Sequence, residues 1–318
     1  MRRSFVGITA ATLLLAAAGA AVADQAGPAA SANRIDLALI GDTPYGAEQL
    51  AAFPALVSAI NSDPKVRLVA HVGDIKNGST RCDDSYFALV AQQFSTFKDP
   101  LVYTPGDNEW ADCHRLNNGA YNPLERLAKL RATFFAEPGE ALGGRNLLVE
   151  AQDAFPENQL WAQSRVVFAA VHAVGSDNGY APWTSNTAAT PAQRAEVDAR
   201  INAALAWINR VFDLAAEQNA AGVALLMQAD TFAGANETLD GFDEIVAAIG
   251  TRAAQFGKPV LLLQGDTHRY LVDEPYATAP NLTRVVVEGE TAAEWLRVSV
   301  NPRSPAVFSW EREILPAG

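Results

Sequence analysis

The pair Gly-Asp follows an apolar, strand-like run at four places in this 318-residue chain. The four segments are 37–42, 66–74, 100–107 and 259–266, and they end in Asp42, Asp74, Asp107 and Asp266. The carboxyl ends of strands in open α/β sheets border the ligand crevice, and a Gly lets neighbouring backbone come close. We therefore expect the four carboxylates to converge on one site. Because converging carboxylates repel one another unless a cation lies among them, the pattern predicts a metal centre.

Other polar residues follow the same strand ends and one further strand. They are Thr43-Pro44-Tyr45, Ile75-Lys76-Asn77, Asn108-Glu109-Trp110, Gln228-Ala229-Asp230 and Thr267-His268. Carboxylate, amide and imidazole groups in these stretches are all able to coordinate a divalent ion.

Strands alternate with helices along most of the chain. We expect strands at 36–40, 66–72, 100–104, 166–171, 222–227 and 259–263, and helices at 47–60, 85–97, 124–135, 191–218 and 242–256. This alternation favours an α/β fold with a mainly parallel sheet. Three strands without intervening helices, at 284–287, 295–300 and 306–310, predict an antiparallel ending. The irregular segment 137–163 is interpreted as an insertion or lid in a single domain that covers residues 34–318.

The composition is that of an ordinary globular protein, with 49% hydrophobic and 19% charged residues. After residue 23, no stretch approaches the ~18 consecutive apolar residues of a membrane span. Without its first 23 residues the chain has 22 Lys and Arg against 36 Asp and Glu, a net charge of about −14. Such a surface argues against nucleic acid or anionic lipid as a partner.

Residues 1–23 have the pattern of an export signal: Arg2 and Arg3, an apolar stretch at 8–20, then Ala21-Val22-Ala23. The order Arg2-Arg3-Ser4-Phe5-Val6 fits a twin-arginine signal as well as a plain positive n-region. Residues 24–33 are interpreted as a flexible leader, because little in them can pack. The sequence therefore predicts an exported protein, periplasmic or secreted.

The chain has two cysteines, Cys82 and Cys113, and both lie in polar loop sequence. An exported chain meets an oxidising compartment, where a pair of thiols usually closes. We expect one disulfide, which would tie the loop after the second Gly-Asp to the loop after the third.

The succession of polar strand ends, from about residue 35 to residue 268, resembles the calcineurin-like metallophosphoesterase superfamily. The motifs of that family are Asp-x-His, Gly-Asp, Gly-Asn-His-Asp/Glu, a lone His and Gly-His-x-His. The resemblance implies a four-layer αββα sandwich with parallel or mixed central sheets and antiparallel C-terminal strands. It also implies hydrolysis of phosphate esters, in which a metal polarises the phosphoryl oxygen and activates the attacking water.

Carried over position by position, the family pattern implies the metal ligands Asp42, Asp74, Asp107, Asn108, Gln228, Asp266 and His268. Asp74 matches the family's bridging ligand, whereas Pro44 stands where the His of the first motif is expected. Gln228 replaces the lone His and Asp266 replaces a further one. A mostly oxygen ligand set suits Mg²⁺, Mn²⁺ or Ca²⁺ better than Zn²⁺, with one ion or two.

The catalytic and substrate-binding residues are more dispersed. Asn108 takes the position of the family's catalytic His, and His114, next to Cys113, is a candidate to replace that His as proton donor. Phosphate needs positive partners, and the motif loops offer Lys76, Arg115 and Arg269, while Tyr45 is placed to line a pocket. Each of the three cations is equally suited to a surface ion pair. We interpret His71 as a hydrogen-bonded core residue and His172 as structural.

Two other functions compete with a phosphoesterase. Gly41-Asp42-Thr43 is similar to the nucleophile motif of Gly-Asp-Ser esterases, but such enzymes need an Asp and a His near the C-terminus, and some 50 residues follow His268. A non-catalytic relative that binds a ligand or partner is the stronger alternative, since most of the family's histidines are missing. The replacements are Asp, Asn and Gln, which are polar and able to coordinate, and this favours a retuned site.

Overall fold

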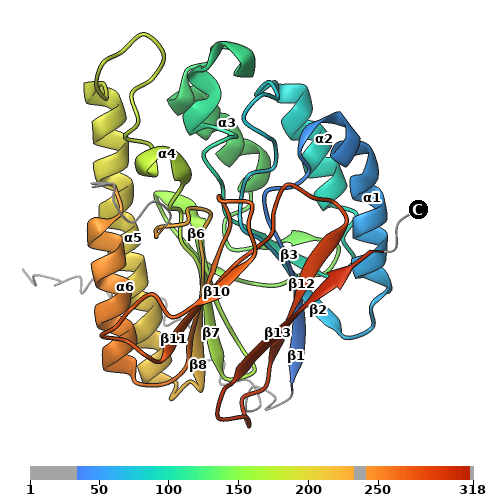
Figure 1. Ribbon diagram of the computed structural model, residues 1–318, viewed down its shortest axis with the longest axis vertical. Coiled ribbons are helices and arrows are strands. Elements are labelled where there is room, and N and C mark those ends of the chain that lie inside the picture. The colour runs from blue at the N-terminus through green and yellow to red at the C-terminus, as the bar shows by residue number, and fades with distance from the viewer. Residues whose placement is uncertain (1–33, 233–240, 316–318) are drawn as a thin grey trace, which may run out of the picture.

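The computed structural model describes residues 34–232 and 241–315. Their strands form two sheets that lie between two layers of helices (Figure 1). The export signal and leader predicted for residues 1–33 lie outside the described residues. Within the described parts of the chain, no helix is both long and apolar enough to cross a membrane.

The first sheet has six strands, and the second has seven. In spatial order the first contains β13 (Phe308–Ile314), β12 (Glu294–Val300), β1 (Ile35–Ile40), β2 (Val66–His71), β3 (Pro100–Tyr103) and β4 (Leu142–Gly143). The second contains β10 (Leu271–Asp273), β11 (Leu282–Val286), β9 (Val260–Gln264), β8 (Gly222–Leu226), β7 (Val166–Ala170), β6 (Phe155–Gln163) and β5 (Glu150–Gln152). Both sheets are mixed, with a parallel centre and antiparallel edges.

Helices cover the outer face of each sheet. The helices α1 (Gly46–Ser62), α2 (Asp84–Phe94) and α3 (Pro123–Phe134) lie on the first sheet, and α5 (Pro191–Glu217) and α6 (Asp243–Phe256) lie on the second (Figure 1). Short turns of helix, η1 (Ala111–His114), η2 (Leu116–Asn118) and α4 (Gly175–Asn178), follow β3 and β7.

Three apolar layers separate the four layers of secondary structure. One joins the first sheet to its helices, one joins the second sheet to its helices, and one fills the space between the sheets. The inner layer contains side chains from facing strands, such as Leu39 of β1, Phe168 of β7 and Leu263 of β9. Buried strands that are apolar on both faces explain why the runs before the Gly-Asp pairs are continuous rather than alternating. The predicted four-layer α/β sandwich is confirmed.

Two regions differ from the expected organisation. The strand expected at 284–287 is β11, which pairs parallel to β9 and antiparallel to β10, so it continues the second sheet instead of beginning an antiparallel ending. Residues 137–163, expected as an insertion or lid, contain β4 at the edge of the first sheet and β5 and β6 in the second. β4 and β5 are edge strands of two and three residues, too short to show a period. The longer inner strand β6 contains Pro156 and buried polar residues at 157–159, which are atypical of a strand.

Parallel pairing brings the functional loops to one end of the molecule. β1, β2 and β3 run parallel and end just before Asp42, Asp74 and Asp107. In the second sheet, β8 and β9 run parallel and end just before Gln228 and Asp266. The two sheets therefore deliver their polar ends to a shared edge.

Candidate metal centre

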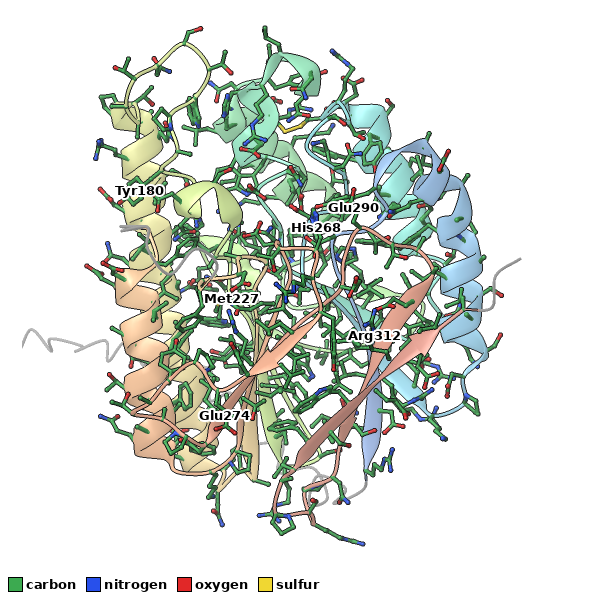
Figure 2. All side chains as sticks on the ribbon, in the orientation of Figure 1. Tyr180, Met227, His268, Glu274, Glu290 and Arg312 are labelled. Carbon is green, nitrogen blue, oxygen red and sulfur yellow. A yellow bond between two sulfur atoms is a disulfide. The ribbon has the colours of Figure 1, made fainter. Side chains whose placement is uncertain are left out.

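Five of the predicted ligands converge at this edge. Two groups of side chains bring single ligand atoms within 4.8 Å of one another: Asp42, Asp74 and His268 form the first, and Asp74, Asp107 and Asp266 form the second. Asp74 belongs to both groups, and all the carboxylates come from loops that follow parallel strands. His268 lies at this end of the sheets beside Glu290 (Figure 2).

The glycines of the Gly-Asp pairs allow neighbouring loops to approach closely. A Cβ on Gly106 would lie 2.0 Å from Asp74 Oδ1, and a Cβ on Gly265 would lie 2.5 Å from Asp42 Oδ2. The Gly of one pair thus makes room for the carboxylate of another. Asp42 and Asp74 themselves have φ angles of 50° and 57°, in the left-handed region that is strained for most residues but visited by Asp.

Burial makes the charges of these carboxylates costly. Burial raises the pKa of Asp42, opposed by the hydrogen bond and charge of His268. Burial, followed by the nearby charges of Asp107 and Glu109, raises the pKa of Asp74 well above its usual range. Burial and the charges of Asp107 and Asp42 raise the pKa of Asp266 in the same way. Each raised pKa means that the ionised carboxylate is unfavourable where it lies, and a bound cation would compensate its charge.

Asp42 fits a metal ligand best. Its Oδ1 accepts a hydrogen bond of 3.0 Å from the Asp266 amide and lies 3.5 Å from His268 Nε2. Its Oδ2 is buried and has no hydrogen-bond partner among the described residues. A buried carboxylate oxygen without a donor is unfavourable unless an ion supplies the missing partner. The residues therefore fit a divalent cation.

Tyr45 and Asn108 lie at the centre, but as donors. The Tyr45 hydroxyl donates to Asp74 Oδ2 at 2.8 Å and lies 3.1 Å from His268 Nε2. Asn108 donates through Nδ2 to Asp74 Oδ2 at 2.7 Å and through its backbone amide to Asp74 Oδ1 at 3.1 Å. Asn108 stays a predicted ligand, and in this structure its nitrogen and not its oxygen faces the carboxylate. Tyr45 is buried against the centre and hydrogen-bonds Asp74.

Gln228 also presents nitrogen. Its Oε1 accepts the Gly175 amide at 2.7 Å, which leaves Nε2 to donate to Asp266 Oδ1 at 3.1 Å and Asp107 Oδ1 at 3.3 Å. A backbone N–H can only donate, so the orientation of the side-chain amide is fixed. The prediction that Gln228 is a ligand therefore finds no support in the contacts of its oxygen.

The three predicted phosphate contacts lie in different environments. Lys76 is fully buried, and its amine donates to the backbone oxygens of Asn77 and Asn108 at 2.9 and 2.7 Å, so these contacts do not support its predicted role in substrate binding. Burial lowers the pKa of Lys76 to about 8. Arg115 is partly exposed and pairs with Asp112 at 2.7 Å. Arg269 is exposed and makes no ion pair with the described residues.

The Arg115 guanidinium lies near the Asn108 side chain. A Cβ placed on Gly78 would lie 3.3 Å from Asn108 Oδ1 and 3.6 Å from Arg115 Nη1, so the amide and the guanidinium share the space beside this Gly. Since Asn108 is bonded to Asp74, the guanidinium lies one side chain away from a candidate ligand.

The remaining histidines do not join the centre. His114 Nδ1 accepts from the backbone amide of Thr184 at 2.8 Å, which attaches it to the loop after α4 instead of the carboxylates. Its predicted role as proton donor therefore finds no supporting contact among the described residues. His71 is buried and bridges Thr43 and Gly73, the hydrogen-bonded core position expected for it. His172 is buried and paired with Glu157.

The predicted disulfide is confirmed. Cys82 and Cys113 are bonded, with Cα atoms 5.9 Å apart, and both side chains are buried. The two sulfur atoms lie 3.6 and 3.7 Å from the backbone oxygen of Asn108. The disulfide therefore packs against the backbone of the loop that carries Asp107 and Asn108.

Three further residues near the centre were given no role in the sequence analysis. Buried Glu109 accepts from the Asp74 and Gly106 amides and from Tyr103, and so ties two Gly-Asp loops together. Ser176 Oγ lies 2.8 Å from both Asp107 and Asp112. Glu290 lies 3.5 Å from His268 Nδ1. Glu109 follows a Gly-Asp pair and was detectable by position, whereas Ser176 and Glu290 belong to loops without any motif.

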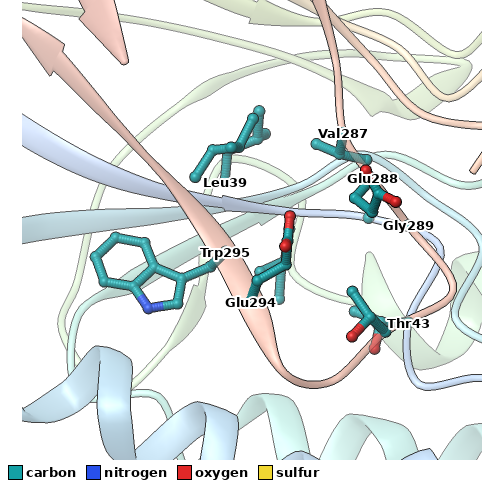
Figure 3. A pocket seen from close by; sticks show the side chains of 11 residues that line it. Leu39, Thr43, Val287, Glu288, Gly289, Glu294 and Trp295 are labelled. Carbon is teal, nitrogen blue, oxygen red and sulfur yellow. The ribbon is translucent and has the colours of Figure 1, made fainter. Parts of the chain in front are cut away.

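A small cavity lies beside Asp42, between the end of β1, the loop at 287–291 and the start of β12 (Figure 3). Its lining includes Thr43, Glu288, Gly289 and Glu294. At about 10 Å³ it has room for about one water molecule. On the other side of Asp42, the His268 side chain is 30% exposed.

Comparison with known proteins identifies one matching family model. The model for calcineurin-like phosphoesterases matches residues 35–203. Comparison with curated protein sequences gives no match. Among solved structures, GAP50, the anchor in the inner membrane complex of Plasmodium, is similar with 8% identity and a TM-score of 0.48 over 89% of this chain and 90% of that one. The purple acid phosphatase PPD1 from yellow lupin (Lupinus luteus) seeds is similar with 10% identity and a TM-score of 0.44 over 89% of this chain and 54% of that one.

Proposed function

Because this chain belongs to the calcineurin-like phosphoesterase family, we propose that it hydrolyses phosphate esters with a divalent cation held by Asp42, Asp74 and His268. The observation that carries the proposal is this triad of two buried carboxylates and the partly exposed His268. Its ligand atoms lie within 4.8 Å of one another, and Asp42 Oδ2 has no partner among the described residues. When bound, a divalent cation supplies a Lewis acid that polarises a phosphoryl oxygen and makes water more acidic.

The chain's own residues hold and orient this triad. Tyr45 and Asn108 donate to Asp74, so its carboxylate is fixed before any ion binds. Glu290 faces His268 Nδ1 and leaves Nε2 turned toward Asp42. Carboxylate partners of this kind set the tautomer and direction of a ligating imidazole.

Arg115 is the proposed contact for the phosphate group of the substrate. It is partly exposed, it lies beside Asn108, and its guanidinium has donors to spare after pairing with Asp112. Arg269, exposed next to His268, is a second proposed contact. Without such groups the acidic centre would repel a phosphate ester.

We propose Mg²⁺, Mn²⁺ or Ca²⁺ over Zn²⁺ as the cation. The triad offers two carboxylates and a single imidazole, a set richer in oxygen than most zinc sites. We also propose that the protein is exported to the periplasm or secreted. The Cys82–Cys113 disulfide supports this location, since such bonds persist in oxidising compartments.

The proposal is tested by comparing the wild-type protein with Asp42→Asn. For both proteins we measure the metal content and the turnover of an aryl phosphate and of a phosphodiester, in the presence of Mg²⁺, Mn²⁺, Ca²⁺ or Zn²⁺. We expect wild-type protein to bind metal and turn over, and the variant to lose at least about 100-fold of its activity, on the order of what loss of a charge-stabilising group costs. Asn tolerates the left-handed backbone at this position, with φ of 50°, so the fold should persist.

The matched control is Asp153→Asn, the same change at an exposed position that should leave activity intact. Removal of the unpartnered carboxylate should also raise the thermal stability of the metal-free protein. Metal binding without turnover of either ester would contradict the enzyme and favour a non-catalytic binding protein. Full activity in the Asp42 variant would show that the site lies elsewhere.

A further inference from the structure

The two groups of candidate ligands differ in how their oxygens are occupied. In the group of Asp74, Asp107 and Asp266, both oxygens of Asp107 accept protein hydrogen bonds, from Gln228 and Ser176. Both oxygens of Asp266 also accept, from Gln228 and the Asp230 amide. Asp74, which belongs to both groups, accepts on both oxygens as well. In the other group, however, Asp42 Oδ2 accepts no hydrogen bond from the described residues.

From this contrast we infer that the centre holds one divalent cation, at Asp42, Asp74 and His268, and that the side-chain amide of Gln228 closes the second position. The inference rests on the proposed function and specifies its metal stoichiometry. Gln228 Nε2 lies between Asp107 Oδ1 and Asp266 Oδ1, at 3.3 and 3.1 Å, and so takes the space that an ion bridging these oxygens would need. Its two N–H groups donate where an ion would attract the same oxygens.

Gln228 is not free to turn its oxygen inward. Its Oε1 is held by the Gly175 amide at 2.7 Å, and Gly175 is so close to the carboxylates that a Cβ there would lie 2.8 Å from both Asp107 Oδ2 and Asp266 Oδ1. Rotation of the amide would point an N–H at the Gly175 N–H and an oxygen at two carboxylates. Both contacts would be repulsive.

The turn that positions Gly175 is itself fixed. Ser176, Asp177 and Asn178 have φ angles of 53°, 55° and 50°, three consecutive left-handed residues. Fully buried Arg200 of α5 donates to the Asn178 side chain and, at 2.5 Å, to its backbone oxygen. A strained backbone persists where its surroundings determine it, so the donor that holds Gln228 is held in turn by a helix of the second sheet's outer layer.

The stoichiometry is measured directly on the wild-type protein. Metal-free protein is loaded with MnCl₂, freed of unbound ion, and examined by elemental analysis and electron paramagnetic resonance. We expect one equivalent of Mn²⁺ and the six-line spectrum of an isolated ion. Two equivalents, or an exchange-coupled spectrum, would overturn the inference while leaving the proposed function intact. No bound Mn²⁺ would overturn both.

Gln228→Glu tests the role of the amide. The variant keeps an oxygen for the Gly175 amide and replaces the donor nitrogen with a second oxygen, so it should open the closed position and bind two equivalents of Mn²⁺ with a coupled spectrum. Gln163→Glu is the matched control. Gln163 is the last residue of β6 and pairs with Val166 at the start of β7, at the end of the sheet away from the centre. This variant should still bind one equivalent of Mn²⁺. A Gln228→Glu protein with a wild-type circular dichroism spectrum and one Mn²⁺ would show that Gln228 does not close the position. If the variant fails to fold, the wild-type count still decides.

Discussion

At the residue scale, the centre places several carboxylates in a buried space and compensates them unequally. Asp74 receives donors from Tyr45 and Asn108, whereas one oxygen of Asp42 receives none from the described residues. Removing a charge from water without a partner costs several kcal/mol in real proteins. The uncompensated oxygen therefore marks the position where an ion is most needed.

Arg115 offers a test of substrate binding at this scale. Arg115→Ala should weaken inhibition by inorganic phosphate about 10-fold and raise KM more than it lowers kcat, because a guanidinium that binds the phosphate group contributes to affinity. The measurement is the phosphate inhibition constant together with KM and kcat for an aryl phosphate. Mn²⁺ content should not change, since Arg115 is not among the candidate ligands.

Arg303→Ala is the matched control, because Arg303 is exposed in the loop between β12 and β13, at the other end of the strands. It should leave all these constants unchanged. An Arg115→Ala enzyme with wild-type phosphate inhibition would assign the phosphate contact to another residue, with Arg269 the next to be replaced.

At the element scale, the disulfide joins two loops that each carry part of the centre. Cys82 precedes α2 and Cys113 lies in η1, and the sulfur atoms pack beneath the backbone oxygen of Asn108. The same oxygen accepts the buried amine of Lys76. The position of Asn108, and through it that of Asp74, therefore depends on a covalent bond between elements as well as on packing.

The double variant Cys82→Ser, Cys113→Ser should lose about 3–4 kcal/mol of unfolding free energy, since the bond closes a loop with a sequence separation of 31 residues. Denaturant unfolding of the two proteins measures the difference. A reducing agent should lower the stability of the wild type and leave that of the variant unchanged. Two free thiols in unreduced, denatured wild-type protein would refute the bond.

At the scale of the whole molecule, a buried ion-pair cluster links an outer helix to the second sheet. Glu157 of β6 pairs with Arg131 of α3 at 2.6 Å and with His172, just after β7, at 2.8 Å. Burial by itself would raise the pKa of Glu157, but the hydrogen bonds and charges of His172 and Arg131 outweigh it and lower the pKa to about 2. The cluster therefore stabilises the fold only while Glu157 is ionised.

The sign of the pH dependence follows from that lowered pKa. Glu157 contributes stability above the unfolded-state pKa of about 4.5, and the contribution is lost as the pH falls toward its folded-state pKa of about 2. Between about pH 6 and about pH 3 the loss should amount to about 2 kcal/mol. Urea unfolding at about pH 6 and about pH 3 should show a smaller pH dependence in Glu157→Gln than in the wild type. Glu140→Gln, at an exposed position, should keep the pH dependence of the wild type. An equal change of unfolding free energy with pH in all three proteins would contradict the role of Glu157.

The fold could be predicted from the sequence because its signals are local. Continuous apolar runs before Gly-Asp identified β1, β2, β3 and β9, and periodic apolar spacing identified the long helices. The strands β4, β5 and β10 were missed because short edge strands have no pattern of their own. The longer inner strand β6 was missed because it contains Pro156 and the buried polar residues 157–159, which break the apolar pattern. The parallel pairing of β11 with β9 is a long-range choice that a run of apolar residues does not encode.

For the centre, the sequence by itself determined which carboxylates converge, because strand direction and a following Gly-Asp pair place Asp42, Asp74, Asp107 and Asp266 at one edge. Only the tertiary structure decided which atom each amide presents. Gln228 turns its nitrogen to the carboxylates because an amide from a different loop, that of Gly175, occupies its oxygen. The tertiary structure also decided the position of Lys76. Its amine is buried because it donates to backbone oxygens of two different loops, those of Asn77 and Asn108. Such contacts join residues that are far apart in the chain. Which group donates and which accepts therefore depends on the tertiary structure that brings them together.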